Sequence, residues 1–186
     1  MAIDVDDPTG RRRGHLLAYF ILSALAISVF LLVLNGIQWL LDPTPKWAIY
    51  NAGDVLGALV LTGLWRLNRA GRTGWAGYGY LFFIIVIVSA LFPLRVLDRV
   101  LILYAIPVLA ASFVTGPGSS FFFAALAALG YTLVYLAGGS PISYNIISAP
   151  SLFLLALVAW QVADRQERYI TERKWAEEAL RESERR

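Results

Sequence analysis

One acidic residue, Asp54, lies deep within a predicted apolar helix, and the residues around it indicate a binding site. Asn51 precedes it by one helical turn, while Arg95 and Arg99 lie four residues apart, on one face of a later helix near the same predicted level. An ionisable side chain costs about 2.5–3.5 kcal/mol near the centre of a membrane helix, so Asp54 requires a partner or a function. We predict a ligand or ion pocket lined by Asn51, Asp54, Arg95, Arg99 and Tyr144.

The same residues also fit structural interpretations. Asp54 and one of the two arginines would form an ion pair, or the arginines would extend their side chains to the headgroup level. Gly53 and Gly57 have the spacing that places two glycines on one helix face, which predicts close approach by a neighbouring helix.

Catalytic and metal-binding groups are sparse in this sequence. It has no cysteine and one histidine, His15, which excludes thiolate metal sites and haem ligation by two histidines. A single histidine without neighbouring carboxylates does not form a metal site. We therefore predict no catalytic residue, no metal site and no cofactor.

The composition is that of an integral membrane protein. Hydrophobic residues make up 58% of the chain and charged residues 16%, with long stretches that lack charge altogether. A mostly apolar run of about 18 residues or more crosses the ~30 Å hydrocarbon core as a helix. Barrel strands alternate in polarity and are shorter, so these runs predict helices and an all-α fold.

The apolar runs predict a polytopic bundle of six transmembrane helices. The predicted spans are 15–35, 47–65, 75–92, 96–114, 120–137 and 145–163. Pro- and Gly-containing turns separate them at 42–45, 68–73, 92–93, 115–118 and 138–141. The predicted organisation is a cytoplasmic segment (1–14), a transmembrane domain (15–163) and a cytoplasmic C-terminal helix (164–186).

The distribution of basic residues predicts the orientation in the membrane, since Lys and Arg near the spans stay on the cytoplasmic side. The predicted inner segments contain Arg11 to Arg13, Arg66, Arg69, Arg72 and seven basic residues of the tail. The outer loops contain Lys46, Arg95 and Arg99. Both termini are therefore expected in the cytoplasm, and the net charge of +3 reflects this bias rather than nucleic-acid binding.

The last 23 residues, 164–186, predict a continuous charged helix. They have no Gly or Pro, and oppositely charged residues four apart recur. A heptad pattern places Val162, Tyr169, Ala176 and Ser183 in one core position, with Ala159, Gln166, Arg173 and Leu180 in the other. It predicts a weak parallel homodimer through Val162, Tyr169, Ala176 and Leu180; a solvated single helix is the structural alternative.

The stretch KWAEEALRESER, residues 174–185, resembles the helical connector that precedes a PAS domain in bacterial sensor histidine kinases and related diguanylate cyclases. The resemblance implies the membrane-embedded sensory and anchoring part of such a protein, in the bacterial inner membrane. Its partners would be the lipid bilayer and a cytoplasmic effector domain. The phosphoacceptor-histidine, ATP-lid and GGDEF-type signatures of these families do not occur in this sequence.

Two other functions are compatible with the same pattern. Six helices in fewer than 200 residues also resemble the small substrate-binding S component of energy-coupling-factor vitamin transporters, although a charged helical tail of this length is unusual there. An accessory or scaffold subunit of a membrane complex, with the tail as its docking element, is the third hypothesis.

Overall fold

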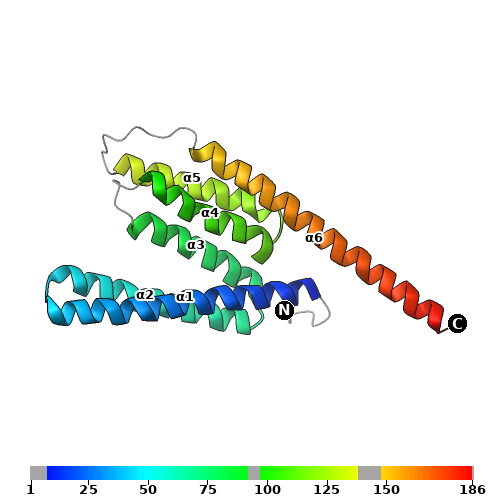
Figure 1. Cartoon of the computed structure of the whole chain (residues 1–186), viewed down its shortest axis with the longest axis horizontal. Coiled ribbons are helices and arrows are strands. Elements are labelled where there is room, and N and C mark those ends of the chain that lie inside the picture. Colours follow the sequence, from blue (N-terminus) through cyan, green and yellow to red (C-terminus); the bar gives the residue numbers. More distant parts are fainter. Residues whose placement is uncertain (1–7, 92–96, 138–147, 186) are drawn as a thin grey trace. The chain divides into compact units, whose positions relative to one another are not determined.

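The computed structural model describes residues 8–91, 97–137 and 148–185, and the elements within these ranges are α-helices (Figure 1). They are α1 (Pro8–Leu41), α2 (Pro45–Arg69), α3 (Thr73–Leu91), α4 (Leu97–Val114), α5 (Ser119–Ala137) and α6 (Ser148–Glu184). Each predicted apolar run corresponds to one of these helices. The predicted all-helical fold is confirmed, since no strand occurs in the described ranges.

The described breaks between helices occur at the predicted turn residues. Thr44 precedes α2 with an extended backbone (φ −89°, ψ 148°), and Pro45 takes the first helical position, where its missing N–H is no loss. Gly71 (φ 83°) and Gly116 (φ 136°) adopt positive φ values in the two following turns, which glycine permits without a Cβ clash. The predicted breaks at 92–93 and 138–141 lie outside the described residues.

Four helices are long and apolar enough to cross a membrane, over Gly10–Leu41, Pro45–Arg69, Thr73–Ala90 and Ser119–Leu136. Only 11% of the apolar window of α1 is buried within the protein. Side chains such as Ile27, Phe30 and Leu40 are exposed and require a surrounding apolar phase. The fold is therefore that of a multi-pass membrane protein.

The described parts of α4 and α6 are less extensively apolar. In α4 the apolar stretch is Ile102–Val114, and in α6 it ends at Ala163, immediately before Asp164. Counted on the described residues alone, four spans satisfy the length requirement, two fewer than predicted.

The chain divides into two compact units, Met1–Tyr80 and Leu81–Arg186, with the boundary inside α3. In the first unit, α1 and α2 form an antiparallel hairpin whose helices lie side by side (Figure 1). Asn68 Nδ2 donates a hydrogen bond to the Gly14 carbonyl oxygen at 3.0 Å. Tyr80 Oη donates to the Phe20 carbonyl oxygen at 3.3 Å, so the start of α3 is tied to α1.

In the second unit, α4, α5 and α6 each pack against the other two (Figure 1). The end of α3 joins through Ser89, whose hydroxyl lies 2.7 Å from Tyr104 Oη. The Tyr104 ring meets the Tyr131 ring edge to face, with centroids 6.4 Å apart. A Cβ on Gly130 would lie 3.1 Å from Ser89 Oγ, so this glycine allows α3 and α5 to approach closely.

Candidate functional site

The two facing surfaces of the α1–α2 hairpin are polar at one end and apolar in the middle. Along α2 and the residue before it, the facing residues recur every three or four positions, at Thr44, Trp47, Asn51, Asp54, Gly57 and Leu61, and Asn68 follows two turns later. On α1 the corresponding residues are Gly14, Leu17, Ile21, Ser28 and Asn35. This spacing places each set along one stripe of its helix. The polar end lies next to the 42–44 turn, where the candidate site is found.

Asp54 is held by α1 through both its side chain and its backbone. Asn35 Nδ2 donates a hydrogen bond to Asp54 Oδ2 at 2.7 Å. Ser28 Oγ donates to the Asp54 carbonyl oxygen at 3.1 Å. Ser28 and Asn35 are two helical turns apart on α1, so the two bonds together fix the position of Asp54 along the hairpin.

The structure places only part of the predicted pocket. Asn51 lies one turn before Asp54 on the same face of α2 and is partly buried, as is Asp54. Arg95 and Tyr144 lie outside the described residues, as does the side chain of Arg99. The predicted pairing of Asp54 with either arginine therefore stays a prediction.

Sequence reasoning missed Asn35 and Ser28. Both belong to the long apolar run of α1, and neither carries a charge that would single it out as Asp54 is singled out. The available signal was their spacing: seven residues separate them, so they share a face of α1, as Asn51 and Asp54 share a face of α2.

The prediction that Gly53 permits close helix approach was wrong. A Cβ on Gly53 would meet nothing within 4 Å, and the residue is exposed. Gly57, three residues after Asp54, is buried on the α1-facing side. The physical reason is the position of Gly53 around the helix axis. Asp54 faces α1, and Gly53, one residue earlier, is turned about 100° away from that direction.

The structure also describes the helix predicted to carry a signal. The first half of α6 buries a row of small residues, Ala156, Ala159 and Ala163, below Leu152. Ser120 Oγ, fully buried on α5, donates to the Ala156 carbonyl oxygen at 3.1 Å. This hydrogen bond ties the apolar half of α6 to α5.

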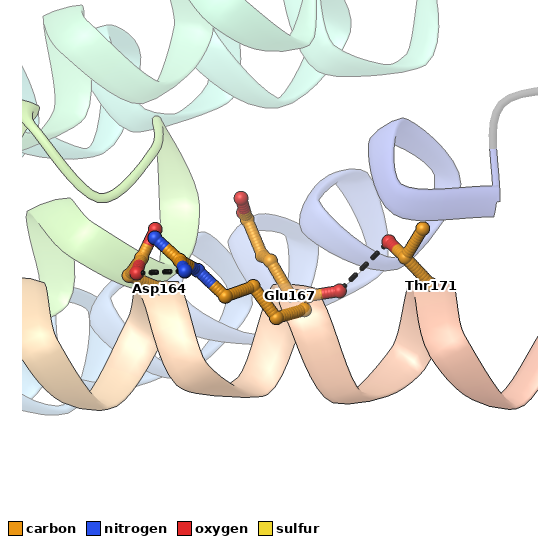
Figure 2. A network of polar contacts seen from close by, with 4 residues as sticks. Asp164, Glu167 and Thr171 are labelled. Atoms are coloured by element: carbon orange, nitrogen blue, oxygen red, sulfur yellow. Dashed lines mark hydrogen bonds and ion pairs between the residues drawn. The ribbon is translucent and has the colours of Figure 1, made fainter.

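The second half of α6 is a charged and largely exposed helix. Asp164 and Arg168 form an ion pair at 2.9 Å, and Thr171 Oγ1 donates to the Glu167 carbonyl oxygen at 2.8 Å (Figure 2). A second ion pair, between Arg173 and Glu177, measures 3.3 Å. Both ion pairs have the i,i+4 spacing expected from the sequence.

The residues of the predicted dimer seam have different environments. Val162, Tyr169 and Leu180 are 43%, 66% and 60% exposed, and Ala176 is exposed as well. Ala159, by contrast, is buried within the second unit and is not available to a second copy of the chain. The seam available for association therefore begins at Val162.

Comparison with known proteins identified no relative of this chain. No protein-family model, curated protein or solved structure matches this chain. Among the described residues, no group of three His, Cys, Asp or Glu side chains could hold a metal ion. The polar end of the α1–α2 hairpin and the long helix α6 are thus the two features on which a functional proposal rests.

Proposed function

We propose that this chain is the membrane-embedded sensory and anchoring region of a bacterial signalling protein. Its last helix passes a signal to a cytoplasmic effector of the PAS or histidine kinase type. The observation that carries the proposal is α6, which runs from Ser148 to Glu184 with no break where the sequence changes from apolar to charged.

A single helix that continues from the apolar into the charged part of α6 can transmit a displacement. The 37 residues of α6 correspond to roughly 55 Å. A rotation or shift of the half that packs on α4 and α5 would be delivered to the charged half, because no hinge residue separates them. The resemblance of residues 174–185 to a PAS connector supports the same direction of transfer.

In this proposal six helices cross the bacterial inner membrane and both termini are cytoplasmic. The 18 residues of α4 measure about 27 Å, close to the hydrocarbon thickness. Arg66 and Arg69 in the last turn of α2, and Arg72 after it, are exposed beside the start of α1. Concentration of arginine at this end of the hairpin supports its assignment to the cytoplasmic side.

The proposed partner of the tail is a second copy of the chain. Beyond Asp164 the helix would lie in water, and contact with a second copy would bury apolar surface of the exposed side chains Tyr169 and Leu180. Gln166 and Arg173 in the heptad pattern would keep the association weak, which suits a two-state relay.

The continuation of the reading frame tests the proposal. Sequencing the transcript past the Arg186 codon, together with the mass of the native protein, is expected to reveal a PAS or kinase domain directly after the tail. A stop codon at that point would overturn the proposal in favour of a transport or accessory subunit.

A further inference from the structure

Four buried polar atoms along the α1-facing side of α2 and the residue before it lack a hydrogen-bond partner among the described residues. One, Asn68 Oδ1, lies at the far end of the helix; the other three, near the 42–44 turn, are Thr44 Oγ1, Trp47 Nε1 and Asn51 Oδ1. Positions 44, 47, 51 and 54 follow one another by three or four residues, so these atoms form a row from the turn to Asp54. We call this set the polar row.

The polar row requires hydration. A buried donor or acceptor left unpaired costs about 1–3 kcal/mol, and proteins ordinarily satisfy such groups with ordered water. The row includes a donor in the indole N–H of Trp47 and an acceptor in the amide oxygen of Asn51, so water can bond to both. It begins at the turn, where Lys46, Nζ 5.1 Å from the Trp47 ring centroid, marks contact with the aqueous phase.

Asp54, at the inner end of the row, has no cationic side chain facing it from α1. Residues 20–41 of α1 contain no titratable group. Between Trp47 and Trp65 of α2, the only titratable side chain besides Asp54 is Tyr50, which is 48% exposed. Asn35 donates a hydrogen bond to the carboxylate but supplies no charge. A carboxylate in such surroundings is stabilised by a bound cation.

We propose that the polar row is a hydrated path that leads from the 42–44 turn to a binding site for one small monovalent cation. The ligands would be the Asp54 carboxylate, the Asn51 amide oxygen and water; hydronium and an alkali ion share this chemistry. One carboxylate matches a single positive charge, and the described residues offer no cluster for a divalent metal. This inference does not depend on the proposed signalling function.

Thiol accessibility tests the hydrated path, because the native chain has no cysteine. The full chain in liposomes would carry Trp47→Cys or Asn51→Cys, with Ala52→Cys on the exposed face as the matched control. A trimethylammonium methanethiosulfonate reagent is expected to modify either row position about tenfold or more faster than Ala52→Cys, since thiolate forms only in water. Equally slow reaction at all three positions would overturn the path.

Charge selectivity tests the cation site. At Trp47→Cys, with Asn51 and Asp54 intact, the cationic reagent should react several times faster than an anionic sulfonate reagent of similar size. Asp54→Asn should abolish this preference while keeping Asn35 as a hydrogen-bond donor. Equal rates for the two reagents in the parent would overturn the site, and would fit a carboxylate already neutralised by Arg95 or Arg99.

The identity of the cation follows from how the preference is lost. If an alkali ion binds, replacing choline with sodium should reduce the preference in the parent and not in Asp54→Asn. If only a proton binds, sodium should leave the preference unchanged and acidification alone should remove it, as for any carboxylate. A preference that sodium leaves unchanged would therefore refute an alkali-ion site at Asp54.

Discussion

Asn35 and Asp54 lie 19 residues apart in sequence, and their side chains meet at 2.7 Å between α1 and α2. The two helices otherwise face each other through apolar and small residues over the middle of the hairpin. Apolar packing is non-directional, whereas this hydrogen bond accepts only one rotation of each helix. Asn35 and Asp54 therefore fix how α1 and α2 are turned toward each other.

Replacement of Asn35 by Leu should lower the thermal stability of the protein in detergent by about 1–3 kcal/mol, because the Asp54 carboxylate would lose its donor. Asp54→Leu alone would leave the Asn35 amide unpaired. The double variant should recover part of the summed loss, which thermal unfolding of the four proteins would measure. Gln38→Leu, at an exposed position of α1, is the control; strictly additive losses would contradict the coupling.

The same design tests the ion pair predicted from sequence. Asp54→Ala combined with Arg95→Ala or Arg99→Ala should restore stability only if an arginine neutralises the carboxylate, since removing one partner strands the other charge. Additive losses with both arginines would leave Asn35 as the demonstrated partner of Asp54.

Gly130→Ala should destabilise the second unit by about 1–3 kcal/mol, because the new methyl group would lie 3.1 Å from Ser89 Oγ and 3.7 Å from the Tyr104 ring. Gly63→Ala is the matched control: its Cβ would meet nothing within 4 Å, and alanine has the higher helix propensity. Thermal unfolding compares the stabilities of the two variants. Similar stabilities would contradict the close approach of α3 and α5 at Gly130.

Cysteines at Thr73 and Ser140 test the six-span topology. In intact cells an impermeant maleimide should label Ser140→Cys and leave Thr73→Cys unlabelled until the membrane is opened. The physical reason is that Arg66, Arg69 and Arg72 are expected to stay on the cytoplasmic side. Labelling of Thr73→Cys in intact cells would invert the orientation.

Single cysteines from Gln166 through Ser183 should cross-link in membranes with a period near 3.5 residues. The maxima are expected at Tyr169, Ala176 and Leu180, which are exposed along the tail. Cysteine at Thr171, on the side of the helix opposite the heptad core, serves as a low-yield control. Uniformly low cross-linking would contradict the dimeric relay and favour an accessory role.

The helices and their described ends were predictable because both depend on local sequence. Apolar runs of sufficient length form helices in lipid, and Pro45 and the glycines at 71 and 116 mark the turns by their own backbone preferences. Asp54 was identifiable because a carboxylate in such a run is unusual.

The partners of Asp54 were not predictable from the same evidence. Which face of α1 meets α2 depends on the rotation of two helices that are apolar almost all round, and such helices have no amphipathic pattern to indicate it. Asn35 and Ser28 become meaningful only once Asp54 is known to face α1. The error at Gly53 has the same origin, because the glycine spacing alone does not specify which side of α2 is covered.

Ser120 gives the attachment of α6 an unusual property. Its hydroxyl has one proton but lies within reach of two acceptors, the carbonyl oxygens of Ala156 on α6 (3.1 Å) and Pro117 in its own turn (3.0 Å). If α6 moved away, the proton would turn to Pro117 and stay bonded, while the Ala156 carbonyl would keep its helical partner. Loss of this hydrogen bond would therefore strand no buried polar group, and α5 and α6 are held together by packing, including the ring contact of Phe121 with Trp160 at 6.3 Å between centroids.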